Sequence, residues 1–163
     1  MDKGQLRTFL VDSNKAGYAS GDERKWIKEP DGSTTIQFEQ GPWRSHDNFF
    51  GGEPYGGRTV VFYEDKPVWM IVYYGWVVEG VNTEQIYSVL RNALKVEPEE
   101  DYQPRGPRKY EEEQFVYMNQ WEGDIESFSG EEKINQKDTL VYKANYMGGW
   151  VDRRKGVSRT IIF

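Results

Sequence analysis

Apolar residues recur first at helical spacing and then in alternation, which divides the chain into a short helix followed by strands. Three of them share one face of a helix over residues 5–16: Leu6, Phe9 and Leu10. Asp2 is suited to cap the start of this helix, and Gly17 is suited to a left-handed stop at its end. The pattern predicts an N-terminal helix with one buried face.

An alternating pattern follows this helix. Residues 24–29 and 34–40 flank Pro30-Asp31-Gly32-Ser33, a turn in which proline fixes φ and glycine accepts a positive φ. In the second arm, Ile36 and Phe38 alternate with polar residues, so one face is expected to be buried and the other to meet water. This segment is predicted to be a β-hairpin.

Five glycines and two prolines fall within the 17 positions of residues 41–57, which predicts an irregular bend. Residues 59–63 and 68–74 then form a second predicted hairpin, in which apolar residues occupy both faces. Strands of this kind lie in the middle of a sheet and are covered on both faces. The second hairpin is therefore expected at the centre of the sheet.

The clearest helix covers residues 83–96. Asn82 and Gln85 have the spacing of a capping box, and Pro98 ends the helix. Residues 99–112 are expected to form an extended, irregular connection. The apolar stripe of the helix is predicted to be core, because a sheet needs a cover: Ile86, Val89, Leu90, Ala93 and Leu94.

Strands return in the second half of the chain. Four are expected: 114–121, 125–129, 139–146 and a terminal strand over 160–163. Glu122-Gly123-Asp124 is expected to turn the chain after the first of them, and Gly148-Gly149 to break the third.

Two stretches resemble each other, which leaves open an internal repeat of residues 34–80 and 113–152. The first echo joins Phe50-Gly51-Gly52-Glu53 to Phe128-Ser129-Gly130-Glu131, and the second joins Val68-Trp69, Tyr73 and Gly75 to Val141-Tyr142, Tyr146 and Gly148. Coincidence among glycines and tyrosines is the alternative. The elements predict one α+β domain over residues 1–163, with a curved, mainly antiparallel sheet, barrel-like if the halves repeat, and two covering helices.

Composition supports a single domain with a real core. Six Trp, eleven Tyr and eight Phe compensate for an apolar fraction of 37%, because large rings bury more area than aliphatic side chains. The absence of cysteine excludes disulfides, thiolate metal sites and cysteine nucleophiles. With no long apolar run and no secretion signal, the chain is expected to be cytoplasmic and not bound to a membrane.

The net charge of −6 argues against generic binding of nucleic acid, which needs a basic face. One local exception lies near the C-terminus, where four basic residues gather: Arg153, Arg154, Lys155 and Arg159. Such a cluster is more often solvated surface. A nucleic-acid partner is therefore not expected.

No sequence motif assigns a catalytic or cofactor site. His46 is the single histidine, and its neighbours Ser45 and Asp47 cannot converge on it as a triad. A metal site built on several imidazoles is excluded by the same count. The glycines match neither the phosphate-binding loop nor the dinucleotide fingerprint. Neither a metal nor an organic cofactor is predicted.

The remaining chemistry is a set of carboxylates beside arginines and aromatic rings. Paired carboxylates could serve glycoside hydrolysis, and an arginine beside them could bind an anion in a bidentate fork. The structural alternative is that Glu53 accepts free backbone N–H groups of the glycine-rich bend. The candidate pocket comprises Trp43, Arg44, Asp47, Glu53, Tyr55, Arg58, Tyr73 and Glu131.

Several motifs resemble a family of uncharacterised bacterial domains. They are Phe38-Glu39-Gln40-Gly41-Pro42-Trp43-Arg44, Asp47, Phe50-Gly51-Gly52-Glu53-Pro54, Val60-Val61-Phe62, Pro67-Val68-Trp69, Tyr73-Tyr74-Gly75 and Arg105-Gly106-Pro107-Arg108. Members occur alone or behind a helix-turn-helix of the XRE repressor type, so the resemblance implies a regulatory or ligand-sensing module. The chain departs from the family pattern at Arg58 and at Ile71-Val72.

Three functions stay open at this point. The first is a non-enzymatic small-molecule-binding or sensor domain, with its pocket along the bend and the aromatic strand after it. The second is a small hydrolase or lyase that uses Glu53 with Asp47 or Glu131. The third is an interaction module that forms a homodimer through an aromatic patch or sheet edge. An enzyme would need two carboxylates within reach of each other, whereas a sensor would need a largely apolar pocket.

Overall fold

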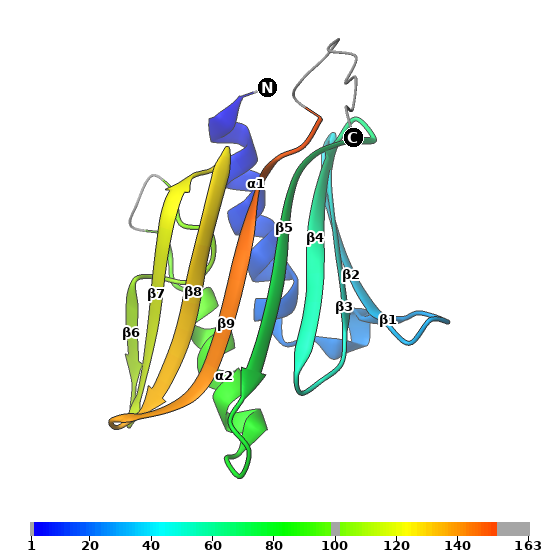
Figure 1. The fold of residues 1–163 in the computed structure, drawn as a ribbon. Helices are drawn as coiled ribbons and strands as arrows, with labels where there is room; N and C mark the ends of the chain where they lie inside the picture. The colour runs from blue at the N-terminus through cyan, green and yellow to red at the C-terminus, as the bar shows by residue number, and fades with distance from the viewer. Residues whose placement is uncertain (1, 99–101, 153–163) are drawn as a thin grey trace, which may run out of the picture.

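Two helices lie on one face of a curved antiparallel sheet (Figure 1). The computed structural model describes residues 2–98 and 102–152. Within these residues the α-helices are α1 (Lys3–Ala16) and α2 (Thr83–Leu94). The nine strands are β1 (Ile27–Lys28), β2 (Thr34–Gln40), β3 (Trp43–Phe50), β4 (Tyr55–Tyr63), β5 (Lys66–Val77), β6 (Lys109–Glu112), β7 (Phe115–Asp124), β8 (Ser127–Gln136) and β9 (Thr139–Trp150).

The strand order is β1-β2-β3-β4-β5-β9-β8-β7-β6. Each helix therefore precedes an antiparallel meander, and the two meanders join where β5 pairs with β9. This arrangement confirms the predicted α+β class. The sheet is open, with β1 and β6 at its edges, and does not close into a barrel.

The pairing of β5 with β9 bears on the suggested internal repeat. Tyr73 lies opposite Tyr146, and Trp69 lies opposite Trp150 in the same register. The aromatic echoes on the two strands are thus related by a local two-fold axis at the tyrosine pair. The other echo has no such relation, since Phe50 ends β3 whereas Phe128 lies within β8. The repeat of residues 34–80 and 113–152 stays a prediction.

The expectation of an irregular bend over residues 41–57 is wrong, because β3 and the start of β4 occupy most of it. Gly57 lies inside β4, where a Cβ atom would meet the carbonyl oxygen of Asn48 at 2.5 Å. Glycine is needed there for close packing between strands, not for a turn. Only Gly41 (φ 58°) and Gly51 (φ 77°) in this segment have a positive φ.

Two other glycines also differ from the expectation. Gly17 follows α1 with φ −86°, so it is not a left-handed stop. Gly148 does not break β9, which continues to Trp150. A Cβ atom at Gly148 would meet the carbonyl oxygen of Met70 at 2.3 Å, so glycine is needed there for the two strands to approach each other. The turn between β7 and β8 falls at Ile125 and Glu126, two residues later than expected. The expected strand over 160–163 lies outside the described residues.

The helix caps and hairpins are closer to expectation. The Asp2 carboxylate accepts a hydrogen bond from Gly4 N at 2.8 Å, and the Asn82 side chain accepts one from Gln85 N at 3.1 Å. The first predicted hairpin exists as β1 and β2, with a shorter first arm. The second is β4 and β5, and β5 is the middle strand of the sheet.

Two hydrophobic clusters fill the space between the helices and the sheet. Leu6 and Phe9 of α1 pack with Trp43, Val61 and Trp69, while the predicted stripe of α2 packs on β7, β8 and β9. The opposite face of the sheet is uncovered by the described residues. The exposed apolar residues there include Val72, Tyr74 and Met147. The expectation that the central strands are covered on both faces is therefore wrong.

Trp69 links the two meanders and provides a test of the fold. Its ring stacks on Phe128 at 5.6 Å, and its Nε1 donates to the carbonyl oxygen of Ile125 at 2.9 Å. We expect Trp69→Ala to lower the unfolding free energy by about 3–5 kcal/mol, because a large buried ring is lost. Trp69→Phe keeps a ring but leaves a buried carbonyl unpaired, and is expected to lower it by about 1–3 kcal/mol.

Urea denaturation followed by circular dichroism measures both effects. Tyr74→Ala on the same strand is the control, because Tyr74 is exposed and is expected to change stability by no more than about 0.5 kcal/mol. A Trp69→Ala loss as small as that of the control would contradict the linking role.

Candidate functional site

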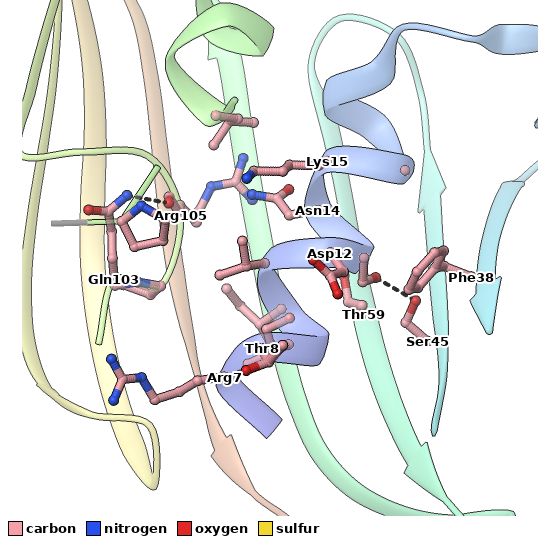
Figure 2. Close-up of a pocket in the computed structure, with 18 of the residues that line it drawn as sticks. Arg7, Thr8, Asp12, Asn14, Lys15, Phe38, Ser45, Thr59, Gln103 and Arg105 are labelled. Atoms are coloured by element: carbon pink, nitrogen blue, oxygen red, sulfur yellow. Dashed lines mark hydrogen bonds between the residues drawn. The ribbon is translucent and has the colours of Figure 1, made fainter. Parts of the chain in front are cut away.

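A cavity of about 550 Å³ lies between α1, the helix-covered face of β2–β5, and the segment that follows α2 (Figure 2). In Figure 2, Phe38, Ser45 and Thr59 lie on one side of α1, and Gln103 and Arg105 lie on the other. Its apolar walls are formed by Leu10, Val11, Ile36, Phe38, Trp69, Ile71, Leu94, Val96, Pro98, Tyr102 and Pro104.

Strand register places one polar pair in the middle of an apolar row beneath α1. Ile36, Asp47, Thr59 and Ile71 are consecutive cross-strand partners on β2, β3, β4 and β5. Side chains of directly paired residues point to the same face of a sheet. The Asp47 carboxyl group and the Thr59 hydroxyl group therefore lie between two isoleucines on the covered face.

Asp47 is the central polar group of this row. Its Oδ1 accepts hydrogen bonds from the Thr59 hydroxyl at 2.9 Å and from the Tyr73 hydroxyl at 2.6 Å. In the described part of the chain, Oδ2 has no hydrogen-bond partner, and Asp47 lines the cavity. Burial raises the pKa of Asp47, although the two hydrogen bonds oppose the shift.

A glycine allows Tyr73 to reach this carboxyl group. Gly57 is the cross-strand partner of both Phe49 and Tyr73, so the row next to Asp47 contains no side chain on β4. Burial and the nearby Asp47 carboxylate hold the pKa of Tyr73 well above its ordinary value. The Tyr73 hydroxyl therefore keeps its proton and acts as a donor to Asp47.

A buried ion pair forms the other side of the cavity. Arg105 Nε donates to Glu132 Oε2 at 2.6 Å, and the side chains are 15% and 0% exposed. The Tyr117 hydroxyl donates to the second oxygen of Glu132. Although burial disfavours its charge, the Glu132 carboxylate holds the pKa of Arg105 above its ordinary range. The guanidinium group also lies 5.6 Å from the Tyr73 ring, so this pair adjoins the Asp47 site.

A second hydrogen-bond chain holds the segment of Arg105 on the sheet. The Tyr146 hydroxyl donates to Asn119 Oδ1 at 2.6 Å, and Asn119 Nδ2 donates to the carbonyl oxygen of Gly106 at 2.8 Å. Both contacts are buried, where hydrogen bonds are costly to break. The cavity wall at residues 102–106 is thus fixed to β7 and β9.

Helix α1 is held over the cavity by polar contacts as well as by its buried face. The Ser13 and Ser45 hydroxyl groups lie 2.6 Å apart, as the dashed line in Figure 2 marks. Gln40 Nε2 donates to Asp12 at 3.0 Å, and Lys15 forms an ion pair with Glu97. The charged groups at this rim are therefore largely paired.

Of the eight residues in the sequence-derived pocket, the structure brings Asp47 and Tyr73 together at the cavity. Glu53 lies in the β3–β4 loop, where Oε1 accepts from Val77 N at 2.6 Å and Oε2 accepts from the Tyr87 hydroxyl at 2.6 Å. Glu53 thus accepts a hydrogen bond from a backbone N–H group, as the structural alternative predicted. The N–H group belongs to β5 and not to the glycine-rich bend.

The other candidates lie apart from this pair. Trp43 is buried in the core. The Arg44 guanidinium group lies 4.0 Å from the Phe62 ring centroid, and the Tyr55 hydroxyl lies 2.6 Å from that of Tyr142. Arg58 is exposed, and Glu131 forms ion pairs with Lys133 and Lys143 on the uncovered face. The function of each stays untested.

The sequence pattern pointed to Tyr73 but missed Thr59, the second partner of Asp47, and the buried ion pair. Thr59 and Ser45 look like ordinary strand residues, and the wall from α1 depends on packing between distant segments. Glu132 did carry a signal, because it lies on the same face of β8 as the apolar residues Phe128 and Ile134. A charged residue at such an inward position needs a partner.

Metal binding and membrane insertion find no support in the part of the chain that the structure describes. Across residues 2–98 and 102–152, no group of three or more His, Asp or Glu side chains could hold a metal ion. In the same residues, every helix is too short or too polar to cross a membrane.

Helices over one face of an open antiparallel sheet, with a cavity between them, define a small α+β domain with an internal ligand-sized space. The family model described as Domain of unknown function (DUF5680) matches residues 47–151, and the chain belongs to that family. Neither a curated protein nor a solved structure matches the chain. Asp47 is the first matched residue, whereas α1 precedes the matched region.

The buried ion pair gives a stability prediction. Glu132→Ala leaves Arg105 buried without its carboxylate, and we expect it to lower the unfolding free energy by about 3–5 kcal/mol. The double variant Arg105→Met/Glu132→Leu is expected to recover most of this loss, because both charges are removed together. Urea denaturation of the two variants and the wild type measures the difference. A double variant no more stable than Glu132→Ala would contradict the charge argument.

Asp47 gives a prediction for pH dependence. Because its pKa is raised above the ordinary 3.8, the folded protein keeps a proton that the unfolded chain releases as pH rises. The unfolding free energy of the wild type therefore falls as pH rises through this window. Asp47→Asn lacks the effect, so its stability relative to wild type is expected to rise by about 1.4 kcal/mol per unit of pKa shift.

Urea midpoints between about pH 3.5 and 8 measure this trend, since the window starts near the ordinary carboxyl pKa. Asp65→Asn is the matched control, because the Asp65 side chain is 95% exposed. An Asp47→Asn variant that becomes less stable than wild type with rising pH would show that the charged carboxylate stabilises the fold.

Proposed function

We propose that this domain is a non-enzymatic sensor that binds a small amphipathic organic molecule in the cavity beneath α1. The observation that supports it is the free Asp47 Oδ2 in a cavity of about 550 Å³ with mostly apolar walls. Ligand pockets in proteins commonly measure about 300–1,000 Å³ and combine apolar walls with a few polar anchors. We also propose that the protein is bacterial, that it acts in the cytoplasm, and that it is related to domains that follow XRE-type repressors.

The hydrolase or lyase alternative has less support. Glu53 has both oxygens engaged, and Glu131 is paired with lysines on the uncovered face. The other carboxylates that line the cavity, Asp12 and Glu97, lie at its exposed rim, where one oxygen of each is bound by Gln40 and Lys15. Neither shares a hydrogen-bond partner with Asp47, so the described contacts do not form the carboxylate pair that glycoside hydrolysis requires.

The interaction-module alternative rests on one observation. Val72 and Met147 are cross-strand partners on the uncovered face, and they are 37% and 60% exposed. A homodimer through this face would cover them. Sedimentation equilibrium that shows a monomer at all concentrations would exclude it.

Occupation of the cavity can be tested with the neutral dye N-phenyl-1-naphthylamine, whose fluorescence rises in apolar surroundings. We expect the dye to bind the full chain with one site. Val11→Trp places a large ring on the α1 wall and is expected to weaken dye binding at least about tenfold, because it fills the cavity. Fluorescence titration measures the dissociation constants.

Gln5→Trp is the matched control, since Gln5 is exposed on the same helix and does not line the cavity. Its affinity for the dye is expected to stay within about twofold of wild type. Equal weakening in both variants, or no binding by the wild type, would contradict the proposed site.

A further inference from the structure

We infer that the ligand is an amphipathic amine, whose ammonium group pairs with Oδ2 of Asp47 while its apolar body lies against the cavity wall. This inference rests on the proposed function and adds the chemical class of the ligand. It follows from the balance of charges around the cavity, from the hydrogen bonds that hold Asp47, and from the residues beside it.

The first step is the balance of charges. Arg105 is paired with Glu132, and Lys15 is paired with Glu97. Among the described residues, Asp12 accepts a hydrogen bond only from the neutral amide of Gln40, but this contact is exposed, so water screens the charge of Asp12; Arg7 also has an interaction partner. Asp47 lines the same cavity and receives hydrogen bonds from two hydroxyl groups. Arg105 and His46 lower the pKa of Asp47 through space, but neither donates a hydrogen bond to it in the part of the chain that the structure describes. A carboxylate in apolar surroundings is stable as a charge only when a cation or strong donors compensate it.

The second step is the direction of the free oxygen. Thr59 and Tyr73 both donate to Oδ1, which fixes the carboxyl group and leaves Oδ2 for a ligand. Because both hydroxyl groups already donate to Oδ1, the group that best complements Oδ2 is a donor. Among ligand donors, an ammonium group adds a charge-assisted hydrogen bond, which is stronger than a neutral one.

The third step is the surroundings of that oxygen. Ile36 and Ile71 flank the Asp47–Thr59 pair in the cross-strand row, and Phe38 and Trp69 belong to the next row on the same face. These side chains suit an alkyl or aryl body and offer no further charge. A ligand with one cationic end and an apolar body therefore satisfies the site, whereas a purely polar cation would leave the apolar walls unmatched.

An anionic ligand is the competing case. The guanidinium group of Arg105 points toward the side of α1 where Asn14 and Lys15 lie (Figure 2). However, an anion there would add negative charge next to Glu132, which already balances Arg105, and next to Asp47. The geometry favours the cation, and the experiment below separates the two.

The test uses three probes that share one chain and differ in the head group: decylamine, decanol and decanoate. Each is titrated against the full chain with bound N-phenyl-1-naphthylamine, and displacement gives its affinity. At neutral pH, decylamine is expected to bind at least about tenfold more tightly than decanol, because a charge-assisted bond to Asp47 is gained. Decanoate is expected to bind more weakly than decanol.

Asp47→Asn is expected to abolish the advantage of the amine, so the ratio of the dissociation constants of decanol and decylamine falls to about 1. Asp47→Ser is a second variant without the charge, for use if the asparagine variant does not fold. Glu131→Gln is the matched control, because this carboxylate lies on the uncovered face, and the advantage is expected to persist in it.

The outcomes separate the inference from the proposed function. If the dye binds but decylamine binds no more tightly than decanol, or keeps its advantage in both Asp47 variants, the inference is wrong and the cavity proposal stands. Preferred binding of decanoate would also overturn it in favour of an anion site at Arg105. If neither the dye nor any probe binds, the proposed function itself fails.

Discussion

The pairing of β5 with β9 is the contact on which the structure depends. It joins two meanders that would otherwise be separate small sheets, and it places Tyr73 opposite Tyr146 at its centre. A sheet becomes stable when it buries an apolar face, which helices provide by covering it. Trp69 reinforces the junction through Phe128 and the carbonyl of Ile125. Once this junction is formed, both helices have a continuous surface on which to pack.

That continuous surface carries polar groups where a simple core would be apolar. Both oxygens of Glu132 accept hydrogen bonds, one from Arg105 and one from Tyr117, so this buried pair fixes the segment beyond α2 against the sheet. Asp47 is different, because one of its oxygens is used and the other is not. A group that raises the free energy of the folded state without a compensating partner is a reasonable place for a ligand to act. This contrast separates a structural acid from a candidate functional one.

The sequence pattern predicted the type of most elements correctly, but it did not predict whether a glycine turns the chain or lies within a strand. The α2 stripe, the Asn82 cap and the hairpin of β4 and β5 follow from local spacing, and all are found. The sequence pattern predicts that Gly57 and Gly148 interrupt strands, yet both lie within strands where a side chain would collide with a neighbouring backbone. Sequence spacing cannot distinguish a glycine that turns the chain from one that admits another strand, because the neighbour comes from a distant segment.

By itself, the sequence determined the α+β class and the buried faces of the two helices. It placed Asp47 in an irregular bend, whereas the structure places it within β3. Only the tertiary structure decided what that acid meets. Its partners Thr59 and Tyr73 come from two other strands. Helix α1 and Arg105, which follows α2 in the chain, supply other walls of the cavity that Asp47 lines. Strand register across four strands, not local propensity, sets these distances. Glu53 and Glu131 lie away from the cavity for the same reason. Pairing with distant residues decides which face of the sheet a side chain occupies and which hydrogen bonds it makes.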